Sequence, residues 1–183
     1  MQYNNEWLKA QLDSGERIKY LFFWGDQPNK DGSIGKSCLS QWFRRSFEYK
    51  DIVFPTAEHW MMAEKALLFE DQIIYEQILV SKTAAEAKKL GRQVRNFEQT
   101  IWEEHRTKIV IQGNYLKFRQ HQDLWAFLDN TKSRVLVEAS PVDRIWGIGR
   151  AANSNNIENP ETWKGLNLLG YVLMEVRDRL RRD

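Results

Sequence analysis

Cysteine is nearly absent from this sequence: Cys38 is the single one among 183 residues, so no disulfide can form within the chain. Long apolar runs are also missing, and no segment approaches the roughly 18 consecutive apolar residues of a membrane-spanning helix. Residues 1–15 are polar and contain no apolar core of a secretion signal. These absences predict a soluble, cytoplasmic protein with no membrane partner.

An excess of charge of one sign is lacking as well. Lysine and arginine total 27 and aspartate and glutamate total 25, which leaves a net charge of +2. Such a balance gives no long-range field for nucleic acid or membranes. The one basic cluster lies at the C-terminus, where cations favour the end of a helix dipole, and consists of Arg177, Arg179, Arg181 and Arg182.

Motifs for metals and cofactors are missing too. The three histidines have no metal-ligand spacing among themselves. Gly35-Lys36-Ser37 lacks the earlier glycine of a phosphate-binding loop, because Lys30 stands at that position. Gly147-x-Gly149 is too short for a dinucleotide fingerprint. We therefore expect neither a metal nor a cofactor.

Tryptophan, by contrast, is abundant, with eight in the chain. Indole fills protein cores, and it also offers a flat face on which a base or a sugar can stack. We expect most of these side chains to lie in the core and one or two to face a ligand.

The order of the predicted elements favours an α+β fold, a helix-rich single domain over residues 1–183 with a small β-sheet. Helices dominate, the strands do not alternate regularly with them, and no linker or repeat divides the chain. Helices are predicted at 3–13, 57–69, 72–79, 83–91, 98–118, 123–128 and 165–181. Strands are predicted at 18–24 and 134–138, with a strand or hairpin near 49–53.

The most informative stretch is residues 54–66. Pro55 and Thr56 mark a helix start, with Thr56 as the N-cap. Glu58 and Lys65 then fall on nearly the same face of that helix, about 10 Å apart along its axis. Both side chains could reach one ligand from a partly apolar face, where a charge needs a partner. The alternative is an ordinary amphipathic helix with the two charges at its edge.

A second informative stretch is Asp143-Arg144-Ile145-Trp146-Gly147-Ile148-Gly149. An aspartate beside an indole suits a ribose, because the carboxylate accepts from vicinal hydroxyls and the indole covers the ring. The glycines let the backbone approach a ligand closely. The alternative is a structural turn with Trp146 in the core.

A third stretch is the predicted start of the last helix, at Gly165 and Asn167. Free amides point outward at a helix N-terminus, so these residues fit an anion site. The alternative is a tight contact between elements that needs small residues.

These stretches match the blocks of a known family in order and spacing. The blocks are Glu58-His59-Trp60 through Lys65-Ala66, Trp102 with Arg106, Asp143-x-x-Trp146-Gly147-x-Gly149, and Trp163-x-Gly165-x-Asn167-x-Leu169-Gly170 with Arg177. Over about residues 20–181 the chain resembles the NADAR family, also called the YbiA-like family. Phe22-Phe23-Trp24-Gly25 and Leu39-Ser40-Gln41-Trp42 are similar to its opening blocks. In the second of these, Gln41 and Trp42 stand where many members have Asn-Phe.

The resemblance implies an N-glycosidase, which hydrolyses the C1–N bond between a (phospho)ribose or ADP-ribose moiety and a nitrogenous base. Known family substrates are phosphoribosylamino-pyrimidine intermediates of riboflavin synthesis and ADP-ribosylated guanine. The expected partner is therefore a small phosphorylated ribosyl-base or ADP-ribosyl compound. An ADP-ribosylated nucleic acid is the other substrate class, since one modified base needs no large basic surface.

Cleaving this bond requires a proton for the leaving nitrogen, stabilisation of charge at C1 and a fixed sugar. We assign proton transfer to Glu58, a role as nucleophile or electrostatic clamp to Lys65, and the ribose hydroxyls to Asp143. A Schiff-base lysine is also what the resemblance implies for Lys65. The further candidates for substrate contacts are Trp24, Gly25, Gln41, Arg44, Trp102, Arg106, Trp146, Gly147, Gly165 and Asn167.

Two other classes of function use the same residues. A non-catalytic module that binds ADP-ribose or a related nucleotide would need the same tryptophan, aspartate and glycine residues, without turnover. An all-structural role would place the tryptophan-rich blocks in the core. The presence of both Glu58 and Lys65 favours an enzyme.

Overall fold

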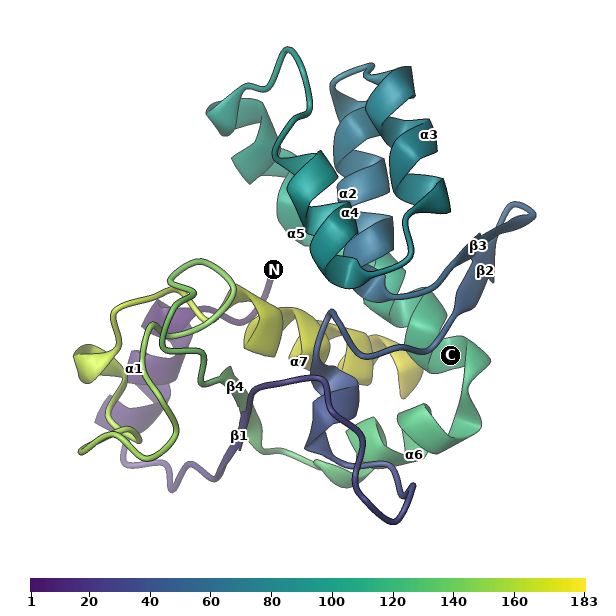
Figure 1. Cartoon of the computed structure of the whole chain (residues 1–183). Helices are drawn as coiled ribbons and strands as arrows, with labels where there is room; N and C mark the ends of the chain where they lie inside the picture. The colour runs from purple at the N-terminus through teal and green to yellow at the C-terminus, as the bar shows by residue number, and fades with distance from the viewer. The chain divides into compact units, whose positions relative to one another are not determined.

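Seven α-helices and two small sheets build an α+β fold, as the sequence predicted (Figure 1). The computed structural model describes all 183 residues. They form two units: the inserted unit, Gln41–His121, and the outer unit, which combines Met1–Ser40 with Gln122–Asp183. No helix is both long and apolar enough to cross a membrane.

The outer unit is built on a parallel pair of strands. Strand β1 (Tyr20–Phe23) pairs with β4 (Val135–Glu138), with Tyr20 opposite Val135. Both strands lie within the predicted ranges, and the apolar side chains of β4 are buried in the core. The α-helices of this unit are α1 (Asn5–Asp13), α6 (Gln122–Asn130) and α7 (Leu168–Leu180). It also contains two short 3₁₀ helices, η1 (Lys36–Leu39) and η2 (Pro160–Thr162).

Helix α7 begins at Leu168, later than the predicted start at residue 165. Asn167 has a left-handed backbone with a φ of 53°, which interrupts regular helical geometry on its N-terminal side. The amides of Leu166 and Leu168 donate to the carbonyls of Arg144 and Ile145. The segment before α7 is therefore held by loop carbonyls instead of by a helical turn.

The side chain of Asn167 closes the open edge of β4. Val135 and Ala139 direct their amides toward β1, so Leu136 and Glu138 turn their backbone groups to the opposite edge. There Asn167 Nδ2 donates to the Leu136 carbonyl at 2.9 Å, and Oδ1 accepts from the Glu138 amide at 2.9 Å. Asn167 is fully buried, so these two bonds satisfy strand groups that water does not reach.

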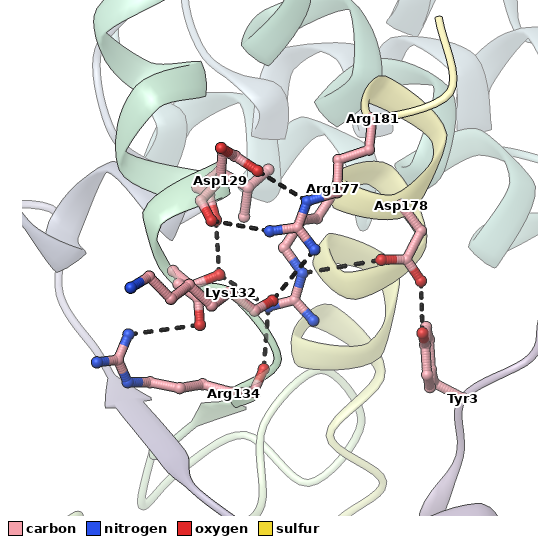
Figure 2. A network of polar contacts seen from close by, with 9 residues as sticks. Tyr3, Asp129, Lys132, Arg134, Arg177, Asp178 and Arg181 are labelled. Carbon is pink, nitrogen blue, oxygen red and sulfur yellow. Dashed lines mark hydrogen bonds and ion pairs between the residues drawn. The ribbon is translucent and has the colours of Figure 1, made fainter.

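At its other end, α7 is tied to the turn after α6 (Figure 2). Arg177 is buried, and its Nη1 donates to Thr131 Oγ1 at 2.7 Å and to the Arg134 carbonyl at 3.0 Å. One turn later, Arg181 pairs with the Asp129 carboxylate at 2.7 Å. The C-terminal arginines thus fix the helix end in addition to favouring its dipole. Figure 2 also labels Tyr3, Lys132 and Asp178, which extend this network.

The inserted unit opens with a hairpin. Strands β2 (Phe47–Tyr49) and β3 (Ile52–Phe54) pair in antiparallel fashion. Lys50 and Asp51 form the turn, with φ values of 50° and 63° that are typical of a two-residue type I′ turn. This confirms the hairpin predicted near 49–53 and makes it a second sheet.

Four helices follow the hairpin, as predicted. They are α2 (Ala57–Leu68), α3 (Gln72–Val80), α4 (Ala84–Gly91) and α5 (Gln99–Gln120). The predicted start signals are confirmed, since Thr56 caps α2 and Thr83 with Glu86 forms a capping box for α4.

Trp60 of α2 lies at the centre of the core of the inserted unit. Its ring contacts Phe54 and Tyr49 of the hairpin, at centroid distances of 5.1 and 5.3 Å. Its Nε1 donates to the Ile109 carbonyl of α5 at 2.8 Å. Gly113 makes room for the ring, because a Cβ at that position would lie 2.3 Å from Trp60 Cδ1. Trp60 therefore joins the hairpin, α2 and α5.

Replacing Asn167 by alanine is expected to destabilise the fold strongly. The substitution leaves the Leu136 carbonyl and the Glu138 amide without partners in the core, at about 1–3 kcal/mol for each group. Asn167→Asp retains the acceptor but not the donor, so it also destabilises. Urea unfolding followed by circular dichroism measures the loss, with the exposed Asn153→Ala as the matched control. A midpoint for Asn167→Ala equal to that of the control would contradict this role.

Candidate functional site

The predicted site residues fall into two groups, one in each unit. The outer unit holds Trp24, Gly25, Asp143, Trp146, Gly147, Gly165 and Asn167. The inserted unit holds Gln41, Arg44, Glu58, Lys65, Trp102 and Arg106. Each group has its own surroundings, built by different elements.

In the outer unit, the group gathers at the carboxyl ends of β1 and β4. These ends lie at one edge because the strands are parallel, and the Ala139 amide extends the pairing by donating to the Phe23 carbonyl at 2.9 Å. Trp24 and Gly25 directly follow β1. Trp24 is 56% exposed, in contrast to the buried Trp60, so its indole face is open for stacking.

Asp143 organises the loop that follows β4. Its Oδ1 accepts from the amides of Ile145 and Trp146, both at 2.8 Å. Its own amide donates to Ser140 Oγ at 3.2 Å. None of these bonds uses Oδ2. Asp143 therefore has a structural role in the turn, and Oδ2 takes no part in these bonds.

The amides expected to bind an anion at the start of α7 are occupied. The Asn167 amide donates to the Gly147 carbonyl at 3.2 Å, and the Leu169 amide donates to the Trp146 carbonyl at 3.1 Å. A Cβ at Gly165 would lie 2.3 Å from the Gly147 carbonyl oxygen. The carbonyls of residues 144–147 therefore take the place of the missing helical turn and occupy the amides of residues 166–169. The alternative of a tight contact that needs small residues describes Gly165.

In the inserted unit, Glu58 lies in the first turn of α2 and is only 2% exposed. Its amide donates to the Gln41 carbonyl at 2.9 Å, which connects the segment before the hairpin to the helix start. Gln41 is also buried, and its Nε2 has no hydrogen-bond partner. This region thus combines a buried carboxylate with an amide donor that is not used within the protein.

His59, the neighbour of Glu58, has a structural role. It is fully buried, with Nδ1 2.8 Å from Thr56 Oγ1 and Nε2 3.3 Å from the Ser81 carbonyl. Burial lowers the pKa of His59, which favours the neutral ring. Both ring nitrogens therefore have partners within the protein. The structure places no group of three or more His, Cys, Asp or Glu side chains to hold a metal ion.

Lys65, further along α2, has an amine among aromatic rings. Its Nζ donates to the Gly91 carbonyl at 2.8 Å and lies 4.2 Å from the ring centroid of Phe97 and 5.6 Å from that of Trp102. Burial lowers the pKa of Lys65, and no charged neighbour contributes to this shift. A lysine with a lowered pKa is neutral for a larger fraction of the time, and the neutral amine is the nucleophile.

Trp102 and Arg106 share one face of α5, because they are four positions apart. Each is 9% exposed. Arg106 Nη1 lies 3.5 Å from Glu103 Oε1, while its buried Nε has no hydrogen-bond partner. An unsatisfied guanidinium donor suits a phosphate or another anion. Arg44, in contrast, is exposed.

The sequence analysis missed two buried polar residues of α5. Asn114 is fully buried, and its Nδ2 donates to Gln41 Oε1 at 2.8 Å and to the Val110 carbonyl at 2.9 Å. Lys117 is also fully buried, with its Nζ 5.5 Å from the ring centroid of Phe43. Both lie on the buried face of α5 with Val110. The sequence signal that could have identified them is a polar residue within an apolar stripe of a helix.

Comparison with known proteins finds similarity over nearly the whole chain. A family model described as the NADAR domain matches residues 22–181, which includes parts of both units. The chain is 44% identical to N-glycosidase R617 of Acanthamoeba polyphaga mimivirus over 169 residues, which is 89% of this chain and 97% of that protein. It is 31% identical over 134 residues to the riboflavin biosynthesis protein PYRR, chloroplastic, of Zea mays, covering 69% of this chain and 20% of that protein.

A solved structure is similar as well. The NMR structure of the Escherichia coli protein YbiA matches with a TM-score of 0.71 and 26% identity, covering 91% of this chain and 87% of that one. In the curated comparison, N-glycosidase YbiA of Escherichia coli is 32% identical over 127 residues, which is 69% of this chain and 71% of that protein. The similarity therefore extends from sequence to fold.

Two substitutions of Asp143 separate its turn-forming role from any contact with a ligand. Asp143→Ala removes the acceptor of two amides and is expected to lower the free energy of unfolding by roughly 0.5–2 kcal/mol, as for the loss of a helix cap. Asp143→Asn retains an acceptor oxygen and is expected to cost less. Thermal unfolding of the two variants checks this order. Equal stability of Asp143→Ala and the wild type would show that the turn does not depend on this side chain.

Proposed function

Because the chain belongs to the NADAR family, we propose that it is an N-glycosidase that hydrolyses the C1–N bond between a (phospho)ribose or ADP-ribose moiety and a nitrogenous base. The similarity to proteins named N-glycosidase supports the reaction class. The name of the maize relative supports an intermediate of riboflavin synthesis as one substrate. ADP-ribosylated guanine, free or in nucleic acid, is the second candidate.

The observation that carries this proposal is the desolvated amine of Lys65, which follows the buried Glu58 on the same helix. A carboxyl group and an amine that are both withdrawn from water are expensive to keep in a fold. In this proposal the carboxyl group serves proton transfer, and the amine is available for attack at carbon.

In this proposal Glu58 transfers the proton. Hydrolysis of the bond adds water across it, so the base leaves with one hydrogen and C1 of the sugar gains a hydroxyl. The Glu58 carboxylic acid protonates the leaving nitrogen, and the resulting carboxylate takes a proton from the attacking water, which restores the acid. Its burial in the first turn of α2 supports this role, because a carboxyl group away from bulk water exchanges protons with the substrate.

Lys65 offers a covalent route to the same products. When the sugar ring opens, C1 becomes an iminium carbon attached to the base nitrogen. The neutral Lys65 amine adds to C1, and the base leaves as a free amine after proton transfer. Water then hydrolyses the new lysine imine to release the sugar and the amine of Lys65. The surroundings of Nζ support this role, since it lies beside the Phe97 and Trp102 rings and burial lowers its pKa.

The outer unit holds its own group of candidate contacts for a sugar. Asp143 Oδ2 accepts from the vicinal ribose hydroxyls, while Oδ1 remains in the turn. Trp146 and the exposed Trp24 provide stacking faces, and Gly25 and Gly147 let the backbone approach closely.

Arg106 and Gln41 are the candidates for binding the phosphate and the base of the substrate. The unsatisfied Nε of Arg106 supports a contact with a phosphate, and the exposed Arg44 is available for a second one. The unsatisfied Nε2 of Gln41 is a donor for a carbonyl of the base. Since Gln41 departs from the family pattern, we propose that it sets the preference between bases.

Replacing Glu58 by glutamine is expected to slow base release by on the order of 10²–10⁴-fold, the usual loss for a missing general acid or base. The assay follows base release by mass spectrometry from phosphoribosylamino-pyrimidines, NAD, ADP-ribose and ADP-ribosylated guanosine. Glu64→Gln, on the same helix, is the matched control and is expected to leave the rate within a few-fold of wild type.

The panel also tests the function itself. Release from one substrate identifies the target of the enzyme. No release from any substrate, together with a melting temperature raised by ADP-ribose, would show a binding module and overturn the proposed reaction.

Lys65→Ala is expected to abolish turnover and the formation of a covalent adduct when substrate and cyanoborohydride are added together. The exposed Lys108→Ala serves as the control. For a nucleophilic Lys65, kcat/KM rises as pH increases through its lowered pKa, because the neutral amine is then formed. An electrostatic clamp shows the opposite dependence, because the clamp is the ammonium form. An active Lys65→Ala enzyme would contradict both roles.

A further inference from the structure

A buried carboxylate in the inserted unit holds two separate segments together. Asp71 is 2% exposed and caps α3 by accepting from the Ile74 amide at 3.3 Å. The same carboxylate accepts from three N–H groups of Arg95: the amide at 2.9 Å, Nε at 3.0 Å and Nη2 at 2.6 Å. These bonds hold the pKa of Asp71 well below its ordinary range, so its carboxylate is charged at all but strongly acidic pH. We call this pair of residues the Asp71–Arg95 clamp.

The segment fixed by this clamp connects α4 to α5 and carries Phe97. The face of the Phe97 ring lies 4.2 Å from Lys65 Nζ, and its ring also contacts Phe69, at a centroid distance of 5.2 Å. Phe97 is 39% exposed, so its side chain contacts both the amine and the solvent. The carbonyl of Gly91, the last residue of α4, accepts from Lys65 Nζ at 2.8 Å. The end of α4 therefore supplies the hydrogen bond to this amine, and the segment that follows supplies the Phe97 ring.

We propose that Phe97 is a positioning residue that keeps water from the Lys65 amine, and that the Asp71–Arg95 clamp holds Phe97 in place. This inference deepens the proposed function and rests on it for the role of Lys65 in catalysis.

The geometry separates the two effects that the ring has on the amine. The face of an aromatic ring attracts an ammonium group, but this attraction is weaker than the solvation by the water that the ring displaces. No carboxylate contributes to the electrostatic surroundings of Lys65: its contacts on α4, on α5 and on the segment between them are a carbonyl and two neutral rings. Exclusion of water is thus the effect that favours the neutral amine, and any apolar side chain of similar size at residue 97 would retain it.

The test measures the pKa of Lys65 without measuring catalysis. The whole protein is labelled with acetic anhydride over a range of pH, and the extent of acetylation at Lys65 is read by mass spectrometry against the exposed Lys108. The midpoint of the pH dependence reports the pKa of the amine and does not change with accessibility alone. Phe97→Ala is expected to move the Lys65 midpoint upward, toward the ordinary value of about 10.4, and each unit lowers the neutral fraction at pH 7 tenfold.

Two further variants test the clamp and the cover separately. Arg95→Ala is expected to raise the midpoint as well, because the segment loses two of its bonds to Asp71. Arg92→Ala removes the same charge from an exposed position of the same segment and is expected to leave the midpoint unchanged. Phe97→Leu is expected to keep the wild-type midpoint, because an apolar cover remains.

The outcomes distinguish this inference from the proposed function. An unchanged midpoint in Phe97→Ala would overturn the role of Phe97, and an unchanged midpoint in Arg95→Ala would overturn the clamp. A Phe97→Leu midpoint as high as that of Phe97→Ala would overturn water exclusion as the cause. If the midpoints shift as expected while the wild type releases no base from any substrate, the positioning role stands and the proposed reaction fails. In an active enzyme, the pH dependence of kcat/KM is expected to move with the midpoint.

Discussion

The outer unit depends on how one strand edge is closed. Strand β4 has a partner strand on one side only, and a buried strand cannot leave the amides and carbonyls of its other edge without hydrogen bonds. The Asn167 side chain supplies one donor and one acceptor there, in the geometry that a neighbouring strand would offer. Gly170 permits this, because a Cβ at that position would lie 2.0 Å from the Leu136 carbonyl oxygen. The start of α7 and the loop that carries Asp143 are both placed by this arrangement.

The inserted unit depends on a different constraint, the cost of keeping polar side chains away from water. Glu58, Asn114 and Lys117 are nearly or fully buried, and Lys65 is partly so. A core built for stability alone would place apolar residues at these positions. Their retention within one small unit is the pattern expected of a functional site, where polar and charged groups are gathered for chemistry.

Much of the fold was predictable because its signals are local. The caps at Thr56 and Thr83 and the alternating pattern of the hairpin depend on neighbours a few positions away. The start of α7 was not predictable, since Asn167 adopts its left-handed conformation through bonds to a strand distant in the sequence. The contacts of Asn167 with β4 and of Gly165 with the Gly147 backbone are likewise distant in sequence. The sequence alone therefore indicated an anion site at these two residues and not these structural contacts.

The same distinction between local signals and contacts distant in sequence applies to the candidate site. The spacing of Glu58 and Lys65 identified the helix face, because a helix repeats regularly. The surroundings of Lys65 could not be derived that way. Phe97 reaches it from a loop whose position depends on a bond between Asp71 and Arg95, and no local pattern links those two residues.

The order of the segments has a consequence for synthesis of the protein. The outer unit is discontinuous in sequence, and Tyr20 must wait for Val135 before the two strands can pair. The inserted unit, in contrast, is continuous and is translated in full before β4 leaves the ribosome. Closing a loop that long costs entropy and slows folding. Until β4 is made, the β1 segment has no strand partner, so this stage of translation is when the chain most needs protection from aggregation.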